Sequence, residues 1–158
     1  MSPESFWYRV LDPVADAVDP ILTLLVLLAP RLERRWPGWW PALRHWLRGS
    51  VVLAIVYAVR ALDARFGIWA AIGADYSTHT AYAVALALCL ACWSRRWRWP
   101  MAVVLLGYAG LILVVGYHSF RDVVTSAAVA GLTAGAVCFV LGDRSRRNRG
   151  RLTQDPAN

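Results

Sequence analysis

The chain has 158 residues, of which 58% are hydrophobic, and its mean hydropathy is +0.43. This apolar share exceeds the roughly 45–50% of soluble domains, so the composition argues against a soluble globular protein and indicates a multi-pass membrane protein. The net charge of +7 comes from seventeen arginines against ten acidic residues, and the chain has no lysine. Because the arginines are divided among the ends of apolar segments, they argue against a nucleic-acid partner.

The N-terminal region is acidic and aromatic, so no cleavable signal peptide is expected. Residues 6–8, FWY, suit the membrane–water interface. Residues 11–32 form the first predicted span, which is long enough for ~30 Å of hydrocarbon. Asp12, Asp16 and Asp19 repeat at helical spacing and lie on one face. That face is predicted to lie above the bilayer or against a watery cavity; alternatively, it pairs with a cation or an arginine at a site.

Residues 31–48 combine five arginines with four tryptophans and two prolines. This composition is typical of an interfacial loop or a short amphipathic helix on the membrane surface. We expect His45, within this segment, to be a surface residue without a catalytic role.

The second predicted span, residues 49–72, is interrupted by Arg60, Asp63 and Arg65. One interpretation is that Arg60 and Asp63 neutralise each other at helical spacing. The other is that Arg60 or Arg65 binds an anionic substrate group, because guanidinium matches phosphate in charge and in geometry.

Three further apolar segments have adequate length for spans: residues 77–93, 101–117 and 122–141. Gly131 and Gly135, four residues apart among small residues, favour close helix packing, within the chain or in a homo-oligomer. The cysteines lie in apolar runs and are expected to pack as small hydrophobes rather than bind a metal or form disulfides: Cys89, Cys92 and Cys138.

These elements predict an all-α fold, a polytopic membrane helical bundle of about five transmembrane helices. An N-terminal and a cytoplasmic interfacial segment accompany the spans. Residues 1–143 are predicted to form a single transmembrane domain, and residues 144–158 a basic, disordered cytoplasmic tail.

The arginines predict the orientation of the chain. Thirteen of the seventeen fall in three segments that five crossings place on one side, namely residues 31–48, 95–98 and 144–151. The positive-inside rule makes that side the cytoplasm. A multi-pass protein of the cell membrane is therefore expected, with residues 63–75 and 118–121 facing the periplasm or the cell exterior.

This topology brings His79, His118 and Asp122 to the outer side. Ser77 and Thr78 are good N-cap residues, so the helix start beside His79 directs free N–H groups and its positive dipole end outward, which favours an anion. At helical spacing, Asp122 can reach one ring nitrogen of His118 and leave the other free for attack or proton transfer. Taken singly, each histidine could be an inert polar residue at the boundary. Together, near arginines, they indicate a phosphoryl-transfer site.

The chain here resembles the type 2 phosphatidic acid phosphatase superfamily, including its sphingomyelin-synthase-like branch, mainly over residues 57–142. Residues 76–80, YSTHT, are similar to the Pro-Ser-Gly-His-Thr signature, and residues 118–123, HSFRDV, match the signature in which Asp and Val follow His. The first signature of that family, a Lys, then six residues, then Arg-Pro, is absent from this chain. Ile112 stands where that family has an arginine, and Arg121 is the nearest substitute.

The resemblance implies a metal-independent, cofactor-free lipid phosphatase at the outer membrane face. His118 would form a phosphohistidine, Asp122 would orient it, and His79 would protonate the leaving alcohol. The substrate would be a polyprenyl or glycerolipid phosphate taken from the surrounding membrane lipids. The residues expected near the phosphate are Arg60, Arg65, Ser77, Thr78 and Arg121.

Three alternatives stay open. The first is a lipid phosphotransferase of the sphingomyelin-synthase type, which differs in its acceptor. The second is a metal-binding or transport protein whose ligands are Asp75, His79, His118 and Asp122, because imidazole and carboxylate suit zinc or manganese. The third is a non-catalytic scaffold that assembles through its glycines.

Overall fold

The computed structural model describes residues 3–33 and 38–141. Over these residues the chain is helical without strands, which confirms the all-α prediction. The five α-helices are α1 (Pro3–Leu28), α2 (Trp39–Phe66), α3 (Thr78–Trp93), α4 (Arg98–Val115) and α5 (Phe120–Val140). Two short 3₁₀ helices, η1 (Ala70–Ile72) and η2 (Arg95–Trp97), precede α3 and α4. The predicted tail, residues 144–158, lies outside the described residues.

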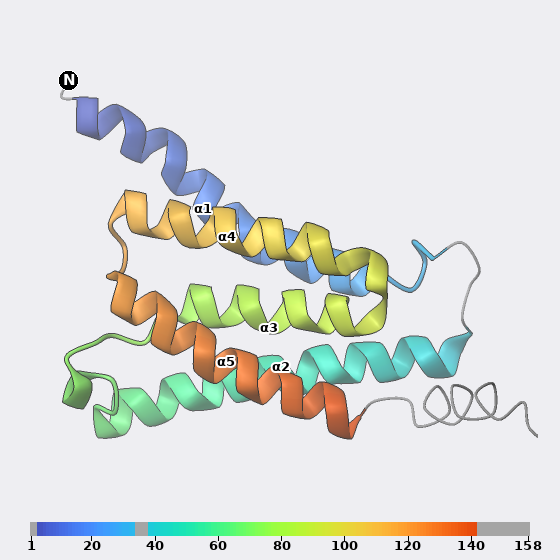
Figure 1. Ribbon diagram of the computed structural model, residues 1–158. Coiled ribbons are helices and arrows are strands. Elements are labelled where there is room, and N and C mark those ends of the chain that lie inside the picture. Colours follow the sequence, from blue (N-terminus) through green and yellow to red (C-terminus); the bar gives the residue numbers. More distant parts are fainter. Residues whose placement is uncertain (1–2, 34–37, 142–158) are drawn as a thin grey trace, which may run out of the picture.

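Helix α3 lies at the centre and contacts the four other α-helices (Figure 1). Its sequence explains this position, because it is apolar on all sides and a helix without a polar face is usually buried. Many of its side chains are alanines, which let the neighbouring helices approach closely. Its buried apolar residues are Ala81, Ala83, Ala85, Leu86, Ala87, Cys89 and Leu90.

The contact between α3 and α5 is made by small side chains. The buried stripe of α5 repeats every four residues: Asp122, Ser126, Ala130 and Ala134. A methyl group added at Gly131 would lie 3.9 Å from Val84, and one added at Gly135 would meet nothing within 4 Å. Within the described chain, Gly131 therefore adjoins α3 at ordinary contact distance, whereas Gly135 does not, so the predicted close packing holds for the first glycine alone. A role of the two glycines in a homo-oligomer stays a prediction.

Two segments of the described chain, Arg95–Val115 and Phe120–Val140, are long and apolar enough to cross a membrane. Helix α3 is apolar but has 16 residues. Aspartates interrupt the apolar pattern of α1, and Arg60 and Asp63 interrupt that of α2. The number of α-helices equals the number of predicted spans, and the other three crossings stay predictions.

The predicted interfacial segment 31–48 is not a separate element where the structure describes it. From Trp39 onward it is the start of α2, which continues to Phe66. His45 has 0% exposure, so the prediction of a surface residue is wrong. Its Nε2 donates a hydrogen bond to the Val26 carbonyl at 3.0 Å, and its ring lies 4.7 Å from the Trp93 ring. The ends of α1 and α3 enclose it.

The helix connections gather at two ends of the bundle. The connection from α2 to α3, residues 67–77, and the connection from α4 to α5, residues 116–119, lie together at the end drawn on the left of Figure 1. We call this the histidine end, since His79 and His118 adjoin these connections. The connection between α3 and α4, with η2, lies at the opposite end, which we call the arginine end because it contains Arg95, Arg96 and Arg98.

Candidate active site

His79 lies in the first turn of α3. Ser77 is the N-cap, as predicted, and its Oγ accepts a hydrogen bond from the Thr80 N–H at 3.3 Å. The Nδ1 atom of His79 lies 2.9 Å from Oδ2 of Asp19 on α1. An ionised carboxylate can only accept, so Nδ1 carries the proton and donates it. The Nε2 atom is therefore the ring nitrogen left for chemistry.

Asp19 is a site residue that the sequence interpretation did not include. The sequence feature that pointed to Asp19 was the row of carboxylates on one face of α1. One of the two interpretations of that face was that it pairs with a group at the site. The observed partner is the imidazole of His79, which that interpretation did not name. Helical spacing identified the acidic face, but only the packing of α1 beside α3 determines which residue faces it.

His118 lies before the N-cap of α5, and its side chain is 15% exposed. Its Nδ1 is 3.9 Å from Oδ2 of Asp122 and 3.9 Å from Oδ2 of Asp75. These separations are too long for hydrogen bonds, so the predicted hydrogen bond between the His118 ring and the Asp122 carboxylate is absent. Since α5 begins at Phe120, His118 is not on the helix, and the spacing rule for helical neighbours does not apply to it.

The carboxylate of Asp122 is instead bonded to backbone groups. Its Oδ2 accepts the Ser119 N–H at 2.7 Å and its Oδ1 accepts the Asp75 N–H at 2.7 Å. The Ser119 Oγ in turn accepts the Asp122 N–H, completing a capping box. Asp122 thus ties the connection before α3 to the start of α5, while its negative charge stays 3.9 Å from His118.

The residues predicted to bind phosphate have different surroundings. Ser77 is fully buried, its N–H donates to Ser126 Oγ at 2.9 Å, and its hydroxyl donates to Thr80 Oγ1 at 2.8 Å. It is therefore a structural cap in this arrangement. Thr78, next to it, is partly exposed. Arg121 is exposed at the histidine end, where its guanidinium lies 3.4 Å from the position that a methyl group on Gly73 would occupy.

Arg60 and Arg65 lie near the C-terminal end of α2. Arg60 forms an ion pair of 3.8 Å with Asp63, as one of the two interpretations predicts, and its side chain stays 48% exposed. Asp63 is buried and also accepts the Trp69 N–H at 2.8 Å, which fixes the turn after α2. The guanidinium of Arg65 lies 5.9 Å from the centre of the Phe66 ring.

The structure brings both histidines to one end of the bundle but gives them different partners. No hydrogen bond or ion pair between His79 and His118 occurs in the described part of the chain. In each ring, Nδ1 is the nitrogen nearest to a carboxylate. No group of three or more His, Cys, Asp or Glu side chains among these residues is arranged to hold a metal ion.

Comparisons with protein-family models, with curated proteins and with solved structures found no match for this chain. The resemblance to the phosphatase superfamily therefore depends on the two short motifs around His79 and His118.

Proposed function

We propose that this protein is a membrane-embedded phosphatase that hydrolyses a lipid phosphate, of the polyprenyl or glycerolipid type, at the histidine end of its bundle. One observation carries the proposal. Two imidazoles from separate parts of the chain come to one end, and each has a carboxylate beside Nδ1. The bond to Asp19 leaves Nε2 of His79 for proton transfer, and in this proposal Nε2 of His118, the nitrogen farther from the carboxylates, is the nucleophile.

Exposed apolar surface supports insertion in a bilayer. Soluble monomers rarely expose apolar patches larger than a few hundred Å². Here large apolar side chains are exposed along the outer faces of α4 and α5: Trp99, Val103, Leu106, Val114, Leu132, Phe139 and Val140. Hydrocarbon around these faces would remove the cost of leaving them in water. The orientation that we propose has the histidine end at the periplasmic or external face and the arginine end in the cytoplasm.

The proposed reaction has two steps. The Nε2 of His118 attacks phosphorus, the bond from phosphorus to the lipid oxygen breaks, and His79 gives its Nε2 proton to that oxygen as the alcohol leaves. Water then attacks the phosphohistidine, the P–N bond breaks, and inorganic phosphate leaves. In the second step His79 accepts a proton from water, which restores the starting state.

The carboxylates have supporting roles in this proposal. Asp19 holds the His79 ring in position and stabilises the imidazolium that donates the proton. Asp122 fixes the backbone around His118 and places a negative charge near its ring. Arg121, with Arg60 and Arg65 on α2, supplies the positive charge for the phosphate oxygens.

The test is phosphate release from a panel of lipid phosphates by the purified protein in detergent or lipid nanodiscs, with a chelator present. His118→Ala should abolish release, and His79→Ala should lower it about 10²- to 10⁴-fold, the usual contribution of general acid–base catalysis. A phosphohistidine should form in the wild type and be absent from His118→Ala. Full release by His118→Ala would contradict the proposal.

The same assay distinguishes the acceptor. A labelled lipid phosphate incubated with a second lipid alcohol yields inorganic phosphate if water is the acceptor. A new labelled phospholipid would instead identify a phosphotransferase.

A further inference from the structure

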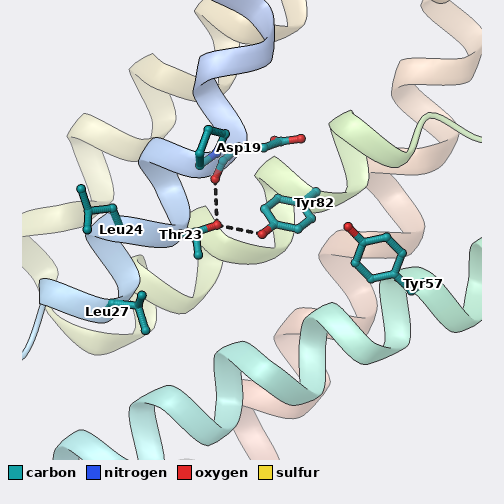
Figure 2. Close-up of a pocket in the computed structure, with 7 residues that line it drawn as sticks. Asp19, Thr23, Leu24, Leu27, Tyr57 and Tyr82 are labelled. Atoms are coloured by element: carbon teal, nitrogen blue, oxygen red, sulfur yellow. Dashed lines mark hydrogen bonds between the residues drawn. The ribbon is translucent and has the colours of Figure 1, made fainter.

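A groove of about 480 Å³ lies between α1 and α2, within the usual size range of small-molecule sites, roughly 300–1,000 Å³. Figure 2 shows its walls, with Tyr82 of α3 and Tyr57 of α2 directed into the space beside α1. Its lining residues are Asp19, Pro20, Thr23, Leu24, Leu27, Tyr57 and Tyr82. Farther along, the two helices are in contact, where His45 Nε2 donates to the Val26 carbonyl at 3.0 Å and Trp46 Nε1 donates to the Leu27 carbonyl at 3.1 Å.

Most polar groups of the groove wall bond to one another. The Thr23 hydroxyl donates to the Asp19 carbonyl at 2.8 Å, so Tyr82, 2.7 Å away, donates its hydroxyl hydrogen to Thr23 (Figure 2). The Tyr82 ring also packs edge-on against Tyr57 at 6.4 Å. These bonds leave ring faces and methylene groups as the surface offered to an occupant. That surface suits a hydrocarbon chain better than a polar ligand.

The groove has one polar end and one apolar end. At the polar end, Asp19 binds His79 through Oδ2, and its Oδ1 is buried without a hydrogen-bond partner. At the other end, Leu24 and Leu27 are 54% and 51% exposed. This polarity matches an amphiphile whose head lies at His79 and whose chain runs along α1 toward Leu27.

We infer that this groove binds the hydrocarbon chain of the lipid phosphate. The inference rests on the proposed function, in which His79 protonates the oxygen that stays with the lipid. The lipid portion must therefore leave on the His79 side, and the groove adjoins that side through Asp19, whereas the phosphoryl group remains on His118. The occupant is a single chain entering sideways from the bilayer between α1 and α2.

Photolabelling tests the location of the chain without using activity. The probe is a long-chain lipid phosphate with a diazirine on its chain, mixed with the wild-type protein in nanodiscs. Labels mapped by mass spectrometry should concentrate on residues 20–27 and Tyr57, and excess unlabelled lipid phosphate should remove them. Labels spread evenly over the exposed faces of α4 and α5, or labels that resist competition, would overturn the inference.

A filling variant gives the second readout. Leu27→Trp should lower kcat/KM for a long-chain substrate by about tenfold or more, a typical effect of altered apolar pocket contacts. The loss for a short-chain alkyl phosphate should be smaller, so the ratio of long-chain to short-chain kcat/KM should fall. Leu132→Trp, at a position that is 75% exposed on α5, is the matched control and should change neither rate. Equal rates for Leu27→Trp and the control on the long-chain substrate would overturn the inference.

The two proposals fail in different ways. Suppose that the probe labels the groove, that unlabelled lipid phosphate removes the label, and that the wild-type protein releases no phosphate. This result would support the chain site and reject the phosphatase. Phosphate release that requires His118, without groove labelling and without an effect of Leu27→Trp, would retain the phosphatase and reject the chain site.

Discussion

Asp122 is the residue whose structural role differs most from the role that its spacing predicts. Its two oxygens accept backbone N–H groups from Ser119 and from Asp75, 47 residues away in sequence. Hydrogen bonds to an ionised acceptor each contribute about 1.5–3 kcal/mol. The carboxylate therefore holds the two connections of the histidine end together, and it acts on His118 through the backbone and through its charge 3.9 Å away rather than through a hydrogen bond.

Asp122→Asn should lower the free energy of unfolding by about 1.5–3 kcal/mol. The amide that replaces one carboxylate oxygen would face a backbone N–H, so one of the two bonds would be lost. Denaturation in detergent micelles, followed by circular dichroism, measures this change. Asp75→Asn is the matched control, because the Asp75 side chain is 69% exposed and its backbone supplies the bond; it should change the stability little. Equal stability of Asp122→Asn and wild type would contradict this role.

His45 should make the folded protein sensitive to acid. Its Nε2 donates to Val26, and Nδ1 is buried without a partner. The pKa of His45 is lowered from 6.5 to about 4, mainly by burial and also by the charge of nearby Arg48, while the Val26 hydrogen bond acts in the opposite direction. An imidazole with a lowered pKa in the folded state stabilises the fold above pH 6.5. This stabilisation is lost as the pH falls toward about 4, because the unfolded chain takes up the proton first.

His45→Gln separates this effect from general acid denaturation. Glutamine keeps an N–H donor for the Val26 carbonyl but does not titrate. Between pH 7 and pH 4.5, the wild type should lose more stability than His45→Gln, by up to about 3 kcal/mol. Chemical denaturation at several pH values gives the comparison. Parallel pH profiles for the two proteins would show that His45 does not titrate as its burial requires.

At the scale of elements, the interface between α3 and α5 depends on small residues. Ala134 has 0% exposure, and it packs in one cluster with Ala81, Ala85 and Cys89 of α3. A larger side chain here would force the helices apart, and such overpacking costs about 1–3 kcal/mol. Ala134→Leu should therefore destabilise the protein in the same detergent denaturation assay.

Gly135→Ala is the control on the same helix. A methyl group there meets no atom within 4 Å, and alanine is favoured over glycine inside a helix by about 1 kcal/mol. The variant should be as stable as the wild type or slightly more stable. If Gly135→Ala destabilised the protein and Ala134→Leu did not, the glycine face rather than the alanine stripe would be the packing face.

Sequence patterns predicted the helices better than they predicted the contacts between them. Apolar runs located the α-helices, and Ser77 was identified as an N-cap because its chemistry is local. The partner of His79 was not identified, since Asp19 lies 60 residues away and only the packing of α1 brings it close. The burial of His45 was missed for the same reason, because the segment around it has a polar composition but is covered by other helices.

At the scale of the whole molecule, charge is distributed unequally between the two ends of the bundle. Among the described residues, the arginine end holds Arg95, Arg96 and Arg98, whereas the histidine end holds the carboxylates of Asp75 and Asp122 together with Arg121. Arginine beside a span favours the cytoplasmic side. If this rule places the arginine end in the cytoplasm, the proposed site at the histidine end would open to the periplasm or the exterior. An odd number of crossings would also place the two chain termini on opposite sides of the membrane.

Two cysteine variants test this orientation in sealed bacterial spheroplasts, in a protein whose own three cysteines are replaced by alanine. Asp75→Cys places a thiol at the histidine end, where the native side chain is 69% exposed. Arg96→Cys places one at the arginine end, where the native side chain is 39% exposed. A membrane-impermeant maleimide should label the first variant in intact spheroplasts and the second only after lysis. If all molecules insert in the same direction, each end of the bundle faces one side of the membrane. Labelling of Arg96→Cys in intact spheroplasts, and of Asp75→Cys only after lysis, would therefore place the histidine end in the cytoplasm. It would reject the external site while leaving the chemistry of His118 to be tested by phosphate release.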